Sequence, residues 1–216
     1  MDDPVQRHPT RAEQLDILAT VVADNYAPGD SLLDLGVGVG YVAQLIFAKQ
    51  PAATIVGVDR KSEALTSAQG AFAGFDLTCI EGDLEAIADL PIPAGPYKAI
   101  YSTLTFHDLT DDAKQAVIRW AAGHLAPGGF FLLYDRLSMT DAALFPLQRS
   151  IWARIEKEYG VGMRSAPDYD TYLDDLGSDN RPAGLADYQK WFADAGLAFQ
   201  ILHLHGNVAL MAGAPV

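Results

Sequence analysis

The sequence predicts an α/β fold: a mostly parallel sheet with helices on both faces, completed by an antiparallel hairpin near the C-terminal end. Short apolar and β-branched runs alternate regularly with segments of helical periodicity, which is typical of right-handed β-α-β units. The last two runs, Leu197–His203 and Val208–Met211, are separated by only a few residues around Gly206. Because that connection is too short for a crossover helix, these two strands are expected to pair antiparallel.

The predicted elements follow one another in a regular order. An apolar stripe at helical spacing predicts a helix over Thr10–Asn25, ahead of the first strand. Further helices are expected at Tyr41–Lys49, Ser62–Ala73, Leu84–Asp89, Asp111–Leu125 and Leu185–Ala195. The parallel strands are expected at the start of Leu32–Tyr41 and at Thr54–Val58, Phe75–Ile80, Tyr97–Ser102 and Phe130–Tyr134. Breaker-rich Pro91–Pro96 precedes the fourth strand, and Pro127-Gly128-Gly129 follows the helix that ends at Leu125.

Length and composition predict one domain over residues 1–216. Half of the residues are hydrophobic, which is enough for a full core. No apolar run approaches the roughly 20 residues of a membrane span, and the polar stretch Met1–Thr10 lacks the features of a signal peptide. We therefore expect a cytoplasmic protein, a monomer or homodimer, with no membrane partner. Cys79 is the only cysteine and lies in an apolar strand, where it is expected to be an inert core thiol.

The charge balance argues against a nucleic-acid partner. The chain has 28 acidic and 15 basic residues, which gives a formal net charge of −13. Such a chain opposes the phosphate attraction that supplies most non-specific nucleic-acid affinity. We therefore expect no nucleic-acid partner.

The most informative stretch is Leu32–Tyr41, LLDLGVGVGY, in which a strand leads into three glycines at alternate positions. Gly36, Gly38 and Gly40 allow a tight turn and a close approach of the backbone to a ligand. The helix Tyr41–Lys49 follows, and its free N–H groups favour a carboxylate or phosphate at this point. The stretch therefore predicts a binding loop.

The residues around the glycines distinguish this loop from a dinucleotide fingerprint. Tyr41 occupies the position that must be small in G-x-G-x-x-G, and Asp34 would repel a pyrophosphate but attract an ammonium group. A ligand with both an amine and a carboxylate is therefore expected. Asp59 follows the next strand about 20 residues later, the separation at which an acid accepts hydrogen bonds from ribose hydroxyls. A solvated loop acid is the alternative.

This loop resembles the first motif of the class I S-adenosylmethionine (SAM) dependent methyltransferases, D/E-x-G-x-G-x-G. The resemblance implies a Rossmann-like sheet of seven strands in the order 3-2-1-4-5-7-6, with SAM as cofactor and S-adenosylhomocysteine (SAH) as product. It also implies direct displacement of the methyl group onto an acceptor, which we expect to be a small molecule. The alternatives are the same fold acting on RNA or protein, and a nucleotide-binding oxidoreductase.

The resemblance extends to the ends of the third and fourth strands. It implies that Asp83 binds the adenine amino group, that Leu84 covers the ring, and that Ser102 and Thr103 meet the methionine moiety. Asp83 could also cap the short helix that follows it, and Arg60 could lie along the adenine or be a surface charge. The expected cofactor-binding residues are Asp34, Gly36, Gly38, Gly40, Asp59, Arg60, Asp83, Leu84, Ser102 and Thr103.

His107 is the candidate catalytic residue. It lies beyond the fourth predicted strand, on the side where open α/β sheets bind ligands. Imidazole can accept a proton near neutral pH, so His107 could act as a base; many relatives carry a histidine here that is not one. Asp108 is expected to be the N-terminal acid of the helix that follows.

The segment Ser138–Gly184 is expected to be a substrate-recognition insert after the fifth strand. Its first half carries an apolar face, Leu144, Leu147, Ile151, Trp152, Ile155 and Tyr159, which packs on the protein's own core or forms a lid over the reacting groups. Its second half, Gly160–Asn180, reads as a long loop. The expected substrate-binding residues, each of which could instead pack or cap, are Asp135, Arg136, Tyr169, Tyr172 and Arg181.

His203 and His205 lie two apart on a predicted strand and therefore point to one face. Such a pair could hold a metal, but no carboxylate or cysteine lies near it in the sequence. We expect a hairpin surface and no metal.

Overall fold

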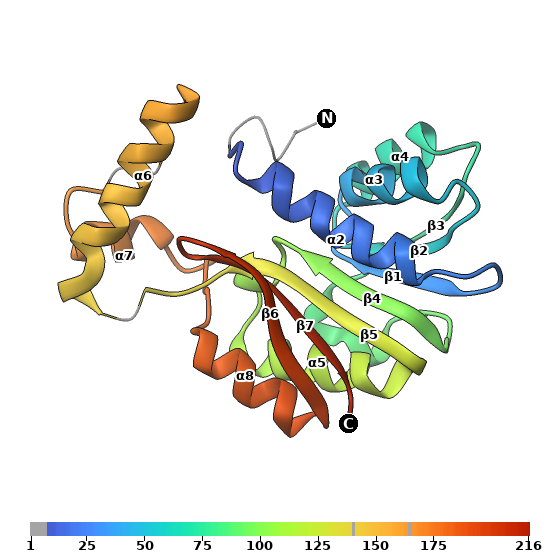
Figure 1. Ribbon diagram of the computed structural model, residues 1–216. Helices are drawn as coiled ribbons and strands as arrows, with labels where there is room; N and C mark the ends of the chain where they lie inside the picture. Colours follow the sequence, from blue (N-terminus) through green and yellow to red (C-terminus); the bar gives the residue numbers. More distant parts are fainter. Residues whose placement is uncertain (1–7, 140, 164–165) are drawn as a thin grey trace.

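The computed structural model describes residues 8–139, 141–163 and 166–216, and its centre is a seven-stranded sheet (Figure 1). The strand order is β3-β2-β1-β4-β5-β7-β6. The first five strands of the chain run parallel, and β7 is antiparallel to both β5 and β6. The strands are β1 Ser31–Leu35, β2 Thr54–Asp59, β3 Asp76–Glu81, β4 Tyr97–Thr103, β5 Leu125–Arg136, β6 Leu197–His205 and β7 Val208–Pro215. The predicted topology is confirmed.

Helices cover both faces of the sheet, so that two hydrophobic cores form. One core joins the sheet to the side that carries α2, α3 and α4, and the other packs α5 and α8 against the opposite face (Figure 1). The helices are α2 Arg11–Asn25, α3 Tyr41–Lys49, α4 Ser62–Ala71, α5 Asp111–His124, α6 Phe145–Tyr159, α7 Tyr169–Leu176 and α8 Leu185–Asp194. Short 3-10 helices are η1 Leu84–Asp89, η2 Phe106–Asp108 and η3 Ala142–Leu144. No described helix is long and apolar enough to span a membrane.

The register of the central strands brings the binding motifs to one edge of the sheet. Asp34 pairs with Gly57 of β2 and with Tyr101 of β4. The strands β1, β2 and β4 are parallel and in step, so their carboxyl ends lie side by side. The strand order reverses direction between β1 and β4, which is where open α/β sheets form a ligand crevice.

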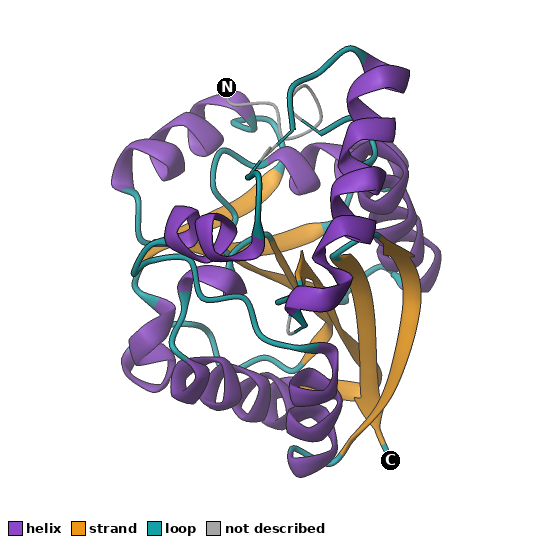
Figure 2. Ribbon diagram, turned by 90° about the vertical axis from the view of Figure 1, so that its left-hand side faces the viewer, coloured by secondary structure: helices purple, strands orange, loops and turns teal. Residues whose placement is uncertain are grey.

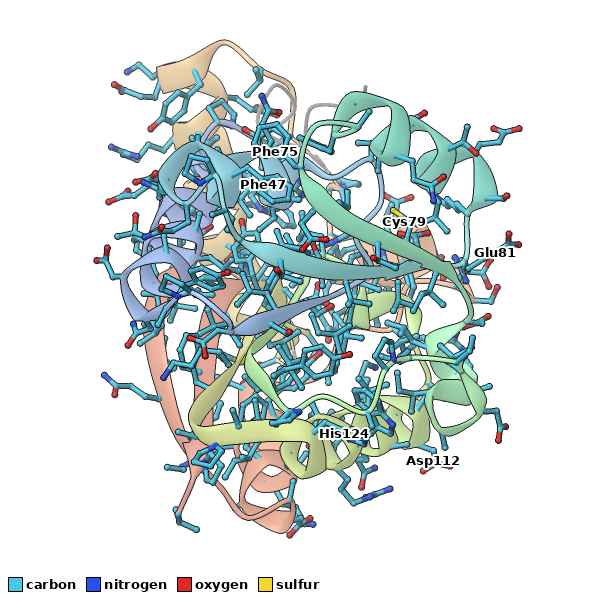
Figure 3. All side chains as sticks on the ribbon, turned by 90° about the vertical axis from the view of Figure 1, so that its right-hand side faces the viewer. Phe47, Phe75, Cys79, Glu81, Asp112 and His124 are labelled. Carbon is cyan, nitrogen blue, oxygen red and sulfur yellow. The ribbon has the colours of Figure 1, made fainter. Side chains whose placement is uncertain are left out.

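An aromatic cluster packs against the last glycine of the loop, Gly40. Phe47 of α3 stacks on Phe75 (Figure 3), with ring centroids 4.5 Å apart. The ring centroid of Phe72 lies 5.7 Å from that of Phe47. Gly40 faces this cluster, because a Cβ on it would lie 2.5 Å from Phe72 Cε2. Gly40 therefore serves the packing of α3 rather than the wall of the binding site.

Cys79 lies on β3 at the edge of the sheet and is half-buried, so it is less enclosed than its apolar surroundings in the sequence suggest (Figure 3). Burial raises the pKa of the Cys79 thiol, and Asp34 adds to this shift. A raised pKa disfavours the reactive thiolate, which agrees with the expectation of an inert thiol. The expected position in the core is wrong, because Cys79 is only half-buried.

The insert after β5 departs most from the expected structure. The second half was expected to be a long loop, but it contains α7, whose first turn is capped by Asp168 accepting a hydrogen bond from Thr171 N at 2.8 Å. Phe145, Trp152 and Tyr172 form a separate small core within the insert. Figure 1 shows α6 and α7 beside the end of the sheet, and Figure 2 shows the insert from that side.

The apolar face of α6 is divided between two environments. Trp152 and Ile155 are buried, as expected of a core-facing stripe. The others stay exposed: Leu144, Leu147, Ile151 and Tyr159. The insert therefore carries more apolar surface than its own core covers.

Asp108 is not the N-terminal acid of α5, which corrects the sequence-based expectation. Thr110 occupies the N-cap position, with an extended backbone and its Oγ1 accepting a hydrogen bond from Ala113 N at 3.3 Å. Asp108 ends η2 instead, where it is available to the binding site.

Candidate cofactor and acceptor sites

A cavity of about 400 Å³ lies at the carboxyl ends of β1, β2 and β4; we call it the smaller cavity. Its volume falls within the range of small-molecule sites. Its lining includes seven of the ten residues predicted to bind a cofactor: Gly36, Gly38, Asp59, Arg60, Asp83, Leu84 and Thr103. The remaining lining residues are Val39, Lys61, Ala64, Gly82, Leu104, Thr105, Asp108 and Leu109.

The glycine loop needs its glycines for two different reasons. A Cβ on Gly36, which has φ +94°, would lie 2.1 Å from Thr105 Oγ1, so Gly36 allows the loop after β4 to approach. Gly38 has φ +53°, and the only atom within 4 Å of its Cβ position is Asp59 Oδ2, at 3.9 Å. Gly38 therefore faces open space in the smaller cavity, and any side chain there would occupy the space of a ligand.

Backbone hydrogen bonds fix the carboxylate of Asp59 in the wall of this cavity. Oδ2 accepts from Gly38 N at 2.8 Å, and Oδ1 accepts from Lys61 N at 2.9 Å. A carboxylate oxygen can accept more than one hydrogen bond, so both oxygens retain capacity for ribose hydroxyls. This ordered position favours the binding interpretation of Asp59 over that of a solvated loop acid.

The smaller cavity is also lined by Asp83, Leu84 and Arg60. Asp83 is the N-cap of η1, because its Oδ1 accepts a hydrogen bond from Glu85 N at 3.0 Å. Asp83 also lines the cavity, so the capping role does not exclude contact with a ligand. The side chain of Arg60 is exposed, and its Nη2 lies 3.8 Å from Asp108 Oδ2. All three residues line the cavity, and the family resemblance implies an adenine beside Asp83 and Leu84.

Two predicted residues lie behind the cavity rather than in its wall. The buried Ser102 donates its hydroxyl to Leu35 O at 2.6 Å, which ties β4 to β1. Asp34 is 2% exposed, and its Oδ1 has no hydrogen-bond partner in the described part of the chain. Desolvation raises the pKa of Asp34 well above its ordinary value, and the neighbouring Asp59 raises it further.

We expect Asp34→Asn to raise the melting temperature (Tm) of the ligand-free chain at pH 7. The pKa of Asp34 is higher in the folded state than its ordinary value of 3.8. Between those two values the folded state binds more protons than the unfolded state, so the free energy of unfolding falls as pH rises through this window. Thermal melts from pH 4 to pH 8 should show a shallower decline for the variant. A variant that melts no higher than the wild type at pH 7 would refute this account.

His107, Asp135 and Arg136 form a hydrogen-bonded chain beside the cavity. Asp135 is fully buried and accepts from His107 N at 2.8 Å and from His107 Nδ1 at 2.6 Å. On the other side of the ring, Arg136 Nη2 lies 2.6 Å from His107 Nε2. A guanidinium can only donate, so Nε2 must accept and Nδ1 must carry the proton. Asp135 therefore fixes the imidazole rather than facing an acceptor directly.

A second cavity, of about 730 Å³, lies between the insert, the β6–β7 hairpin and the start of α2; we call it the larger cavity. Two of the residues predicted to bind the substrate, Arg136 and Tyr172, are in its lining. Its other lining residues are His8, Thr10, Arg11, Gln148, Ile151, Trp152, Ile155, Val161, Gly162, Met163, Leu176, Asn180, Pro182, His205, Gly206, Asn207 and Val208. His107 is in neither lining, but contacts Arg136 of the larger cavity and lies 3.4 Å from Asp108 Oδ1 of the smaller one.

Two predicted substrate residues have structural contacts instead of cavity positions. Tyr169 donates its hydroxyl to Met139 O at 2.5 Å and packs within the insert. Arg181 donates its backbone N–H to His107 O at 2.5 Å and its Nη2 to Asp108 O at 2.6 Å. Both residues therefore hold the insert in place, which is the packing or capping alternative for these positions.

Sequence reasoning missed Arg11 and Asn180 as cavity residues. Arg11 begins α2 and comes to the larger cavity only because α2 packs near the β6–β7 hairpin, where Gln14 Nε2 donates to Val208 O at 3.3 Å. His205, expected on a hairpin surface, lies in the lining of the larger cavity. No group of three metal-ligating side chains occurs in the described residues. No local pattern in the sequence joins these positions.

The reversal of strand order, the glycine loop and the carboxylate after β2 together define a nucleotide-binding α/β protein. A family model described as a methyltransferase domain matches residues 32–129. The chain is 35% identical to a trans-aconitate 2-methyltransferase of Azoarcus sp. (strain BH72), over an alignment of 227 positions that includes gaps, with 83% of each protein covered. The chain belongs to the class I SAM-dependent methyltransferases.

Other similar proteins agree with this family. The chain is 31% identical over 109 residues to an uncharacterized methyltransferase of Synechocystis sp.; the match covers 50% of this chain and about half of that relative, 48%. A solved magnesium protoporphyrin IX methyltransferase of Synechocystis, with SAH bound, superimposes with a TM-score of 0.64 at 16% identity. That match covers 100% of this chain and 89% of the other, and shows the fold alone.

SAM is the cofactor of this family, and the smaller cavity fits it. The cavity is open at Gly38 and lined by the fixed carboxylate of Asp59. Thr103, which lines the cavity, has a buried Oγ1 without a hydrogen-bond partner among the described residues. Because buried polar atoms are normally paired, this atom in the cavity wall is the pattern expected of a site for a polar ligand.

Proposed function

We propose that this chain transfers the methyl group of SAM to a small-molecule acceptor by direct displacement, and that the larger cavity holds the acceptor. The observation that carries this proposal is the larger cavity itself, whose volume of about 730 Å³ suits a small molecule. His107 links the linings of the two cavities, because it contacts Arg136 of the larger cavity and lies 3.4 Å from Asp108 Oδ1 of the smaller one. The cytoplasmic location remains a prediction.

The residues of the chain align the reactants and exclude water. SAM, when bound, supplies a methyl group that is already activated by the positive charge on its sulfur. Gly36 and Gly38 shape the loop against which the cofactor lies, and Asp59 accepts hydrogen bonds from its sugar. The insert covers the acceptor. Alignment and desolvation of this kind supply most of the rate where the leaving group needs no further activation.

We propose a positioning role for His107. Its Nε2 accepts a hydrogen bond from Arg136, and its Nδ1 proton is held by Asp135. A direct role as a base would require Arg136 to leave Nε2. The arrangement favours a histidine that orients Arg136 toward the acceptor, and replacing His107 by alanine should weaken acceptor binding more than it lowers the maximal rate.

Methylation of RNA is the alternative within the same fold. The chain is 35% identical over 125 residues to the ribosomal RNA small subunit methyltransferase C of Mannheimia succiniciproducens, covering 55% of this chain and 36% of that protein. The net charge of −13 opposes RNA binding. The relative named trans-aconitate 2-methyltransferase supports a small acceptor, over a much larger share of both proteins.

Methyl transfer into fractionated cell extract tests this proposal. The chain is incubated with SAM labelled in its methyl group and with three fractions: small molecules, RNA and protein. We expect label in the small-molecule fraction and none in RNA or protein, and no transfer by a Gly38→Asp variant. Label that enters RNA or protein instead would overturn the proposal.

A further inference from the structure

The lining of the larger cavity includes residues whose buried polar atoms have no hydrogen-bond partner. Among the residues that the structure describes, Asn180 Oδ1 and His205 Nε2 are buried and unpaired, and both residues line this cavity. They come from distant parts of the chain, because Asn180 lies between α7 and α8 and His205 ends β6. Buried polar atoms are normally paired, so their meeting in one cavity indicates a ligand with polar groups of its own.

Three hydrogen bonds of Arg181 fix the backbone next to Asn180. The backbone N–H of Arg181 donates to His107 O at 2.5 Å, and its Nη2 donates to Asp108 O at 2.6 Å. The carbonyl oxygen of Arg181 accepts from Nζ of the fully buried Lys114 at 2.6 Å. The backbone that carries Asn180 is therefore anchored beside the loop after β4, and Asp108 of that loop lines the smaller cavity.

The unpaired atom of Asn180 is a hydrogen-bond acceptor. A carboxamide oxygen can only accept, so the ligand group that satisfies it must carry a hydrogen on oxygen or nitrogen. The last torsion of an asparagine side chain has a broad range, so a rotation about it can turn the oxygen toward the cavity. An ionised carboxylate has no hydrogen to donate and would face this oxygen as a second acceptor.

The rest of the lining favours a neutral donor over a cationic one. No aspartate or glutamate of the described residues lines the larger cavity, so an ammonium group would enter it without a carboxylate partner, which is unfavourable away from water. A hydroxyl group supplies the required hydrogen without a charge. The insert adds apolar surface through Ile151, Trp152, Ile155 and Met163. These features fit an apolar body that carries a hydroxyl group.

We propose that Asn180 is a specificity-determining residue of the acceptor site: the acceptor is a neutral hydroxyl compound with an apolar body, and Asn180 Oδ1 accepts a hydrogen bond from its hydroxyl group. This inference rests on the proposed function, since it takes the larger cavity to be the acceptor site. The assignment concerns recognition of the hydroxyl group, whichever atom of the acceptor is methylated.

Calorimetric titration of the SAH-loaded chain tests the inference with three probes of one shape: 3-phenylpropan-1-ol, its methyl ether and 3-phenylpropionate. Only the alcohol can donate a hydrogen bond at neutral pH. We expect the alcohol to bind about fivefold or more tightly than either of the others, the effect expected when a buried acceptor gains or lacks its partner. Equal or tighter binding of the ether or the carboxylate would overturn the inference, as would failure of the alcohol to bind.

Two variants of Asn180 separate the hydrogen bond from the shape of the side chain. Leucine and aspartate both have nearly the size of asparagine, but only aspartate can accept a hydrogen bond. Asn180→Leu should bind the alcohol and the ether equally, whereas Asn180→Asp should keep a preference for the alcohol. A preference for the alcohol that survives in Asn180→Leu would refute the assignment of this residue.

Asn25→Leu is the matched control for these variants. Asn25 is exposed at the end of α2 and lies outside both cavity linings, so this variant should keep the wild-type preference. Asn180→Leu should melt no lower than the wild type, because it removes a buried polar atom that has no partner. The comparison of the alcohol with the ether in the wild type is decisive without any variant.

SAH titration of the same preparations separates this inference from the proposed function. Asn180 does not line the smaller cavity, so SAH should bind each variant as it binds the wild type. Failure of SAH to bind the wild type overturns the proposed function. Normal SAH binding without a preference for the alcohol overturns the inference alone.

Discussion

Replacing Gly38 by aspartate is expected to weaken SAH binding by roughly 100-fold or more, because it places an unpaired charge in the ligand's space. The Cβ position of Gly38 is open to the smaller cavity, and its one neighbour within 4 Å is Asp59 Oδ2 at 3.9 Å. The new carboxylate would therefore lie beside an existing one, where the sugar and amino-acid parts of the cofactor are expected. Isothermal titration of SAH measures the loss.

Gly38→Asn is the matched control for this experiment. Asparagine has nearly the size of aspartate, lacks its charge and tolerates the left-handed backbone that φ +53° requires. We expect the asparagine variant to lose less affinity than the aspartate variant, and both to melt within a few degrees of each other. SAH binding by Gly38→Asp at wild-type affinity would remove the glycine loop from the binding site.

Replacing Asp135 by alanine is expected to lower the free energy of unfolding by about 3 kcal/mol, since it leaves buried donors of His107 unpaired. Asp135 is fully buried and accepts from both the backbone N–H and the ring Nδ1 of His107. For a chain of this size, that loss corresponds to a drop in Tm of roughly 6 to 12 °C. Chemical and thermal denaturation measure the two quantities.

The control for this prediction is Asp112→Ala. Asp112 is an exposed acid in the first turn of α5 (Figure 3), where its loss should cost only a few tenths of a kcal/mol. The tautomer of His107 gives an independent readout: nitrogen NMR should show the proton on Nδ1 in the wild type. An Asp135→Ala chain as stable as the control would contradict the role assigned to this carboxylate.

The sheet, and seven of the ten predicted cofactor residues that line the smaller cavity, could be predicted from the sequence because their signals are local. A strand, a glycine loop and a helix occur consecutively in Leu32–Tyr41, and parallel pairing then brings Asp59 and Thr103 to the same edge. Each of these residues directly follows or ends its own strand. Their positions in space therefore follow from the topology alone.

The acceptor side could not be predicted in the same way, because it depends on packing between distant segments. Arg11 and Arg136 meet in one cavity only after α2 has packed near the hairpin that follows the insert. Asp135 was expected near the substrate, but the backbone and ring of His107 occupy its carboxylate. Residue type and spacing do not indicate that Asp135 is buried while its neighbour Arg136 lines the cavity.

A crystal structure of the chain with SAH bound is the most direct test of the cofactor site. We expect SAH in the smaller cavity, with its amino-acid end at the Gly36–Gly38 loop, its sugar hydroxyls on Asp59 and its purine beside Asp83. We also expect the larger cavity to remain open next to the sulfur. SAH bound elsewhere, with the glycine loop closed by side chains, would contradict both the cofactor site and the function built on it.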